Sequence, residues 1–219
     1  MNSKFSLWGY RSARTGAAAV TLLLLPFLLG GVPARADTAQ AIVVLGDSIS
    51  AGYGIQREQG WVHLLDQTLA EHDQAWSVVN ASISGETTGG GRARLRGVLD
   101  THTPAIVIIE LGGNDGLRGY PIDNIRRNLT AMVNMARGHG ATPIIVGMRI
   151  PPNYGARYSS AFDDVFGDVA SATQAKLVPF LLSEVALAED LMQDDGIHPT
   201  AAAQPLLLNA VWTHLQPLL

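Results

Sequence analysis

The sequence predicts an α/β fold whose central sheet is parallel and covered by helices on both faces. Short β-branched apolar runs alternate along residues 37–219 with longer segments of helical period, as is typical of α/β proteins. One such run, residues 106–109 (Ile-Val-Ile-Ile), is apolar at consecutive positions rather than at every second one. That pattern is expected of parallel strands that are buried on both faces.

The apolar runs and the periodic segments give the elements in order. The runs predict five strands, Ala41–Leu45, Trp76–Asn80, Ala105–Glu110, Thr142–Met148 and a weaker Lys176–Val178. The periodic segments predict five helices, Trp61–Glu71, Gly91–Leu99, Ile122–Arg137, Ala161–Gln174 and Ala201–His214. Pro205 lies inside the last helix, so either it marks the first helical turn or the helix begins with an irregular turn after Thr200.

The first 36 residues have the features of a secretory signal peptide. A basic start precedes an apolar stretch over residues 17–29, and Ala34-Arg35-Ala36 supplies an Ala-x-Ala cleavage site. A membrane anchor is the alternative, but the apolar stretch is short for a span. We therefore expect cleavage after Ala36 and a single domain over residues 37–219, located in the periplasm of a Gram-negative bacterium or secreted.

The charge and the cysteine content limit the classes of binding partner and membrane anchor that the chain is expected to have. The chain has 15 Lys and Arg, 19 Asp and Glu, and no cysteine. Cleavage at residue 36 would remove four positive charges and no acidic residue, which leaves a net charge of −8 and argues against a nucleic-acid partner. A lipoprotein anchor would need a cysteine at the cleavage point. We expect a monomer with no stable membrane anchor after cleavage, stable without disulfides because 183 residues can bury an ample core.

Four short motifs follow predicted strands. They are Gly46-Asp47-Ser48, Ser82-Ile83-Ser84-Gly85, Gly112-Gly113-Asn114-Asp115 and Asp195-Gly196-Ile197-His198. Each alone is commonplace in turns. Because ligands bind at the carboxyl ends of parallel strands, the four motifs are expected on one edge of the sheet. Together they supply a serine, a histidine, a carboxylate and N–H donors, which is what an acyl-transfer hydrolase needs.

Ser48 and His198 are the expected nucleophile and base. A neutral serine is a poor nucleophile and requires a base that keeps the right tautomer. His198 is the best placed of the six histidines, because Asp195 lies three residues before it and Pro199 restricts its backbone. Asp194 competes with Asp195 for the orienting role. Other serines that compete with Ser48 are Ser50, Ser82 and Ser84.

An oxyanion would be stabilised by the backbone amides of Ser48 and Gly85 and by the side-chain amide of Asn114. Glycine at position 85 lets the backbone approach a substrate closely. The chain contains no His-Glu-x-x-His motif or comparable cluster, so we expect no metal and no other cofactor. The Gly-x-Ser-x-Gly elbow of α/β-hydrolases is also missing, which argues against that fold.

At these residues the chain resembles the SGNH, or GDSL-type, hydrolase family. The resemblance extends over the whole chain after residue 36, and its long matching segments are residues 79–85, 110–119 and 192–199. Ile49 replaces the leucine of the usual Gly-Asp-Ser-Leu. The resemblance implies a flavodoxin-like three-layer α/β/α sandwich with five parallel strands. It also implies Ser48 as nucleophile, His198 as base with Asp195 as partner, and Gly85 and Asn114 as oxyanion donors.

The implied activity is hydrolysis of esters and thioesters with acyl tails, such as a lysophospholipid, an acyl-CoA or an aryl ester. Leu117, Tyr120, Pro152 and Tyr154 are expected to line the acyl chain, although their two segments could equally be ordinary surface loops. A carbohydrate acetyl esterase with the same catalytic set is an alternative. A non-catalytic periplasmic binding domain is another, which the complete catalytic set argues against.

Overall fold

The computed structural model describes residues 40–72 and 75–219, so the predicted signal peptide lies outside the described residues. Five parallel strands form one sheet in the order β2-β1-β3-β4-β5. The strands are β1 Gln40–Gly46, β2 Trp76–Asn80, β3 Ile106–Glu110, β4 Thr142–Val146 and β5 Lys176–Val178. This is the flavodoxin-like order, and the predicted five-stranded parallel sheet is confirmed.

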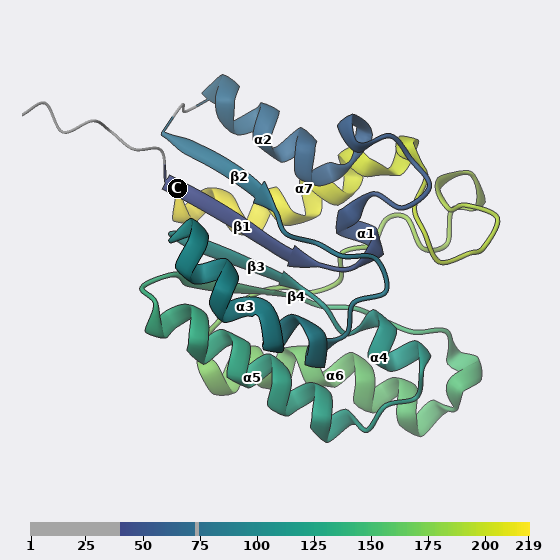
Figure 1. Cartoon of the computed structure of the whole chain (residues 1–219). Helices are drawn as coiled ribbons and strands as arrows, with labels where there is room; N and C mark the ends of the chain where they lie inside the picture. The colour runs from purple at the N-terminus through teal and green to yellow at the C-terminus, as the bar shows by residue number, and fades with distance from the viewer. Residues whose placement is uncertain (1–39, 73–74) are drawn as a thin grey trace, which may run out of the picture. The chain divides into compact units, whose positions relative to one another are not determined.

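Helices cover both faces of the sheet and make three layers (Figure 1). The α-helices are α1 Ser48–Ala51, α2 Trp61–His72, α3 Thr88–His102, α4 Gly113–Leu117, α5 Ile122–Gly138, α6 Ala156–Thr173 and α7 Gln204–Leu215. Helices α2 and α7 pack on one face, and α3, α5 and α6 pack on the other. Short α1 and α4 lie at the end of the sheet where β1 and β3 finish.

The strand residues explain why both faces are covered. In β3, Val107 and Ile109 pack against α3, α5 and α6, whereas Ile106 and Ile108 pack against α2 and α7. Successive side chains of a strand point to opposite faces, so an uninterrupted apolar strand needs apolar partners on both sides. All four are essentially inaccessible to solvent.

Several element bounds differ from those expected. The sequence did not predict two short helices, α1, which begins at Ser48, and α4, which contains Asn114. Helix α3 begins three residues early because Thr87 caps it by accepting from Gly90 N–H. Both alternatives for the last helix hold, since a 3₁₀ turn at Ala201–Ala203 precedes α7 and Pro205 lies in the first turn of α7. Within the described ranges, no helix is long and apolar enough to cross a bilayer.

Candidate active site

The four motifs meet at the carboxyl edge of the sheet. Ser48 is the first residue of α1 and comes two residues after β1 ends. Asn114 lies in α4 after β3. The loop that contains Gly85 runs beside the end of β1, where Ile83 N–H donates to the Gly46 carbonyl at 3.0 Å. Because all strands are parallel, their following loops are brought to one edge.

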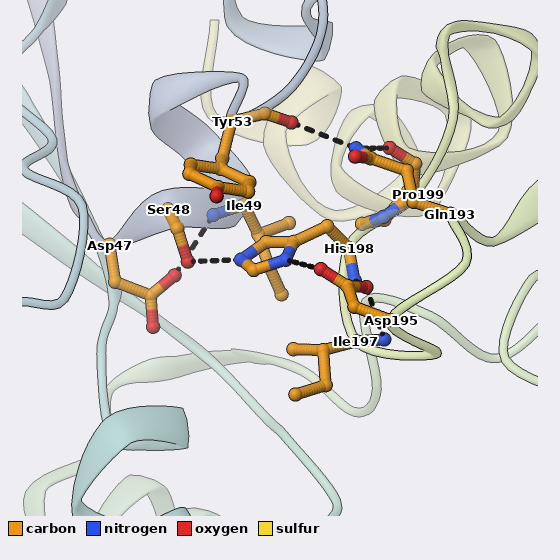
Figure 2. A network of polar contacts seen from close by, with 9 residues as sticks. All are labelled: Asp47, Ser48, Ile49, Tyr53, Gln193, Asp195, Ile197, His198 and Pro199. Atoms are coloured by element: carbon orange, nitrogen blue, oxygen red, sulfur yellow. Dashed lines mark hydrogen bonds and ion pairs between the residues drawn. The ribbon is translucent and has the colours of Figure 1, made fainter.

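Ser48, His198 and Asp195 form a continuous hydrogen-bonded chain (Figure 2). His198 Nε2 lies 2.9 Å from Ser48 Oγ, across 150 residues of sequence. His198 Nδ1 lies 2.6 Å from Asp195 Oδ2. With Nδ1 protonated toward the carboxylate, Nε2 is free to accept the serine proton, which is the arrangement that a nucleophile and its general base require.

Asp195 also fixes the backbone of the histidine loop. Its Oδ1 accepts from Ile197 N–H at 2.9 Å and from His198 N–H at 3.0 Å. The hydrogen bond with the His198 side chain, helped by these amides, lowers the pKa of Asp195 to about 2, so the carboxylate is ionised at neutral pH. Asp194 is exposed and makes no side-chain hydrogen bond or ion pair within the described chain. The geometry therefore favours Asp195 over Asp194 as the partner of His198.

Each of the expected oxyanion donors has an N–H group that no acceptor of the described residues occupies. Neither the Ser48 nor the Gly85 amide donates to another protein group in the described part of the chain. Gly85 has φ +79°, a left-handed conformation that favours glycine. The Asn114 side chain uses one amide hydrogen on Asp47 Oδ2 at 3.1 Å, which leaves the other for a ligand.

Two buried carboxyl groups, Asp47 and Glu110, lie beside the segment that carries Ser48, and the sequence reasoning gave neither a role. Glu110 Oε2 accepts from Ser50 Oγ at 2.7 Å and from Asp47 N–H at 3.2 Å. Burial, reinforced by the charge of Asp47, raises the pKa of Glu110 well above its usual range. Burial also raises the pKa of Asp47, to about 6, against the lowering effect of the Ile49 N–H bond. Burial of both carboxyls therefore favours a proton on the pair, more strongly at Glu110, and Asp47 Oδ2 accepts from the Asn114 amide.

A groove of about 850 Å³ opens beside Ser48 on the side of β4 and β5. Its lining is mainly apolar and includes Ile49, Leu117, Met148, Pro152, Phe180 and Ile197. Of the four residues expected to line an acyl chain, Leu117 and Pro152 line this groove. Tyr120 and Tyr154 are exposed outside the lining, where the Tyr154 hydroxyl donates to the Leu117 carbonyl at 3.1 Å.

Two further residues beside the triad carried no sequence signal of their own. The Tyr53 ring packs against the His198 ring with centroids 4.4 Å apart and an interplanar angle of 37°. Gln193 Nε2 donates to the carbonyls of Tyr53 and Pro199 (Figure 2). Within residues 40–72 and 75–219, no group of three His, Asp or Glu side chains is placed to hold a metal ion.

Residues 44–205 match the GDSL-like lipase/acylhydrolase family. The chain is 51% identical over 181 residues to the protein named esterase TesA of Pseudomonas aeruginosa, covering 83% of this chain and 90% of that protein. It is 42% identical over 195 residues to the Escherichia coli protein named thioesterase 1/protease 1/lysophospholipase L1, covering 89% and 92% of the two chains.

Solved structures agree with these matches. The crystal structure of TesA superposes with a TM-score of 0.80, covering 82% of this chain and 100% of that one. The psychrotrophic esterase EstA from Pseudoalteromonas sp., in a structure inhibited by monoethylphosphonate, is 41% identical with a TM-score of 0.78, covering 82% and 98% of the two chains. The family match extends over more than half of the chain, and the relatives are aligned over most of their length. The chain therefore belongs to the GDSL-like lipase/acylhydrolase family of serine hydrolases.

Proposed function

We propose that this chain hydrolyses carboxylic esters and thioesters that carry acyl tails, through an acyl-enzyme at Ser48. The observation that carries the proposal is the hydrogen-bonded chain from Ser48 Oγ through the His198 ring to Asp195. Relatives named esterase, arylesterase and thioesterase/lysophospholipase support the same reaction class.

In the first half-reaction, His198 Nε2 takes the Ser48 hydroxyl proton as Oγ attacks the carbonyl carbon. The C–O or C–S bond to the leaving group then breaks, and His198 gives its proton to the departing alcohol or thiol. In the second half-reaction His198 activates a water, which releases the carboxylic acid and returns the proton to Ser48 Oγ. Asp195 stabilises the imidazolium that forms in both halves.

Negative charge develops on the carbonyl oxygen in both tetrahedral intermediates. The free N–H groups of Ser48 and Gly85 and the second amide hydrogen of Asn114 would receive it. Because these donors are held in place before the reaction, they need no reorganisation as the charge forms.

The acyl tail would lie in the apolar groove beside Ser48. Its mainly apolar lining, which includes Met148, Phe180 and Ile197 besides polar side chains such as Arg149 and Asn209, supports a hydrocarbon chain over the sugar of a carbohydrate acetyl ester. Replacing Leu117 by alanine should therefore shift the preferred chain length in a nitrophenyl-ester series from acetate to palmitate. Tyr120→Ala is the matched comparison, since Tyr120 lies outside the lining. An unchanged profile for Leu117→Ala would remove the groove assignment.

For localisation we propose that residues 1–36 are cleaved and that the domain of residues 37–219 acts in the periplasm as a monomer. N-terminal sequencing of the exported protein should begin at Asp37. An exported enzyme would meet mainly lysophospholipids and small diffusible esters rather than acyl-CoA. Retention of residues 1–36 on the mature protein would contradict this proposal.

The decisive test of the reaction is covalent labelling. A fluorophosphonate should label Ser48 stoichiometrically, and Ser48→Ala should abolish labelling and lower kcat on nitrophenyl butyrate by about 10⁴–10⁶. Ser84 is an exposed serine two residues after Ser82, in the loop that contains Gly85. The Ser84→Ala variant is the control and should still be labelled at Ser48. A non-catalytic binding domain would not be labelled at all.

A further inference from the structure

Asp115 is the last residue of the motif over residues 112–115, and the proposed reaction gives it no role. It is only 2% exposed, and its carboxylate is bound on both oxygens. Oδ2 accepts from Thr88 N–H at 2.8 Å, and Oδ1 accepts from the Thr88 hydroxyl at 2.6 Å. The Thr88 hydroxyl in turn accepts from Asn128 Nδ2 at 3.1 Å. One buried carboxylate therefore holds both donors of a fully buried residue 27 positions earlier in the chain.

These two hydrogen bonds lie next to two of the three proposed oxyanion donors. Asn114 directly precedes Asp115, and Gly85 lies three residues before Thr88. Helix α4 lies beside the start of α3 (Figure 1). Successive residues of a helix point about 100° apart, so α4 directs Asn114 toward Asp47 and the next residue toward α3. The carboxylate thus connects the segment that carries one donor to the segment that carries the other.

The first turn of α3 needs such a connection, because its sequence is a poor helix former. Residues 89–91 are three consecutive glycines, and glycine weakens a helix more than any residue except proline. A Cβ at position 91 would collide with the Leu111 side chain, so close packing requires glycine there. Thr88 N–H is also one of the first helix amides, which lack an acceptor within the helix. Asp115 supplies that acceptor, and its negative charge suits the positive end of the helix dipole.

The loop that carries Gly85 is fixed on both sides. Before Gly85, Ile83 N–H donates to the Gly46 carbonyl at the end of β1. After Gly85, the two carboxylate bonds hold the start of α3. A third bond, from Arg118 Nη2 to the Gly85 carbonyl at 3.2 Å, is exposed to water, which competes for it. The buried bonds are therefore the stronger constraint on the position of this loop relative to α4.

We propose that Asp115 is a positioning residue of the oxyanion site, which sets the separation between the Gly85 amide and the Asn114 side-chain amide by holding Thr88. The inference rests on the proposed hydrolase function, because it concerns the donors of that same site. Asp115 touches no reacting atom and transfers no proton. Because the two donors act on charge that develops in the transition state, their misplacement should lower kcat and leave KM nearly unchanged.

The first test removes the Thr88 hydroxyl with little change in side-chain volume. Thr88→Val should lower kcat on nitrophenyl butyrate about 10- to 30-fold, and Thr88→Ser, which keeps the hydroxyl, should stay within about threefold of wild type. Asp115→Asn leaves the Asn128 bond in place and should lower kcat by a factor similar to that of Thr88→Val, because its NH₂ group would face one of the two Thr88 donors. Each kcat is expressed per active site titrated with a fluorophosphonate, so that unfolded protein is not counted.

A double-mutant cycle with Asn114→Ala separates positioning from a loss of stability. If the carboxylate sets the separation of two donors, its effect depends on the presence of both. Thr88→Val should therefore lower kcat by less than about threefold when Asn114 is already replaced by alanine. Equal factors in the two backgrounds would overturn the proposal, because a general weakening of the fold acts equally on both.

Thr87→Val is the matched control. Thr87 is the N-cap of α3, and its hydroxyl accepts from Gly90 N–H at 3.2 Å, a bond that does not involve Asp115. Its substitution weakens the same helix start but keeps the connection to α4, so kcat should stay within about twofold of wild type. A fall as large as that of Thr88→Val would overturn the proposal, since any weakening of the helix start would then suffice.

The same measurements distinguish this inference from the function on which it rests. A wild type that neither hydrolyses the ester nor reacts with the fluorophosphonate would overturn the hydrolase function, and the inference with it. An active wild type with an equally active Thr88→Val would overturn the inference alone. A variant that raised KM without lowering kcat would do the same, because the loop would then act on substrate binding.

Discussion

Gln193 Nε2 lies 2.8 Å from the backbone carbonyl oxygen of Tyr53, a residue 140 positions earlier in the chain. The same nitrogen donates to the Pro199 carbonyl at 3.0 Å. One side chain therefore ties the segment that carries Ser48 to the loop that carries His198. Glycine at position 54 makes room for it, because a Cβ there would clash with Gln193 Oε1 and Gly54 has φ +75°.

Replacing Gln193 by methionine should lower kcat about 10- to 100-fold with little change in KM. Methionine fills a similar volume but donates no hydrogen bond, so the two catalytic segments lose a fixed separation, and small misplacements of reacting groups are costly. The rate of fluorophosphonate labelling should fall in parallel, since it depends on the same Ser48–His198 geometry. Steady-state kinetics on nitrophenyl butyrate with thermal unfolding of each variant checks this.

Gln67→Met provides the control for that substitution. Gln67 is exposed on α2, its side chain makes no hydrogen bond within the described residues, and its replacement should leave both kinetic constants unchanged. If Gln193→Met kept wild-type kcat, or if it raised KM alone, the two hydrogen bonds of the Gln193 side chain would have no part in positioning Ser48 and His198.

The sheet was predictable because each strand is dictated locally. Buried parallel strands need uninterrupted apolar runs, and the runs at residues 41–45 and 105–110 lie within one residue of the observed β1 and β3. Helix starts were less predictable. Helix α6 begins at Ala156, five residues before the expected Ala161, because its first turn is mostly polar and exposed and so lacks an apolar signal.

The proposed reacting residues could be predicted for a different reason, whereas the residues that hold them in place could not be predicted. Ser48, Asn114 and His198 follow strands in glycine-containing motifs, so the parallel topology alone brings them to one edge. From the sequence alone, Glu110 is expected to be the last residue of a strand and Gln193 a polar residue of a loop. Their roles depend on contacts 60 and 140 residues away, with Ser50 and Tyr53, which no local pattern encodes.

Asn114→Ala should lower kcat about 10²–10³-fold while the protein stays folded. The variant removes one of three oxyanion donors but neither the nucleophile nor the base. KM for a nitrophenyl ester should change little, because the donor acts mainly on charge that develops in the transition state. Wild-type turnover by Asn114→Ala would exclude the oxyanion role of this side chain.

Asp195→Asn should lower kcat about 10²–10⁴-fold, because an amide cannot stabilise the imidazolium and can favour the wrong tautomer of His198. Asp194→Asn makes the same change in charge one residue away and should stay within about twofold of wild type. In wild type the low pKa of Asp195, about 2, means that its ionisation does not contribute to the acid limb of the pH–rate profile above pH 4. Equal losses in the two variants would contradict the assignment of Asp195.

Glu110→Gln should keep kcat within about threefold at pH 7, whereas Glu110→Leu should lose activity and stability. Glutamine can still accept from Ser50 Oγ and Asp47 N–H through its carbonyl oxygen, but leucine leaves both buried donors without a partner, at a cost of about 1–3 kcal/mol for each donor. Retention of activity by the neutral amide would fit a neutral Glu110 at that pH.

The same variant tests the raised pKa of Glu110 through stability. Unfolded Glu110 ionises near its usual pKa of 4.5, whereas the folded carboxyl stays protonated to a much higher pH, so the unfolded state binds fewer protons between the two values. The free energy of unfolding of wild type should therefore fall relative to Glu110→Gln as pH rises above 4.5, with a slope approaching about 1.4 kcal/mol per pH unit. Urea unfolding of both proteins between pH 5 and 8 measures this difference, which includes the coupling between Glu110 and Asp47. Parallel stability curves would mean that Glu110 ionises in the folded protein at its ordinary pKa. The assignment of a raised pKa to this buried carboxyl would then be wrong.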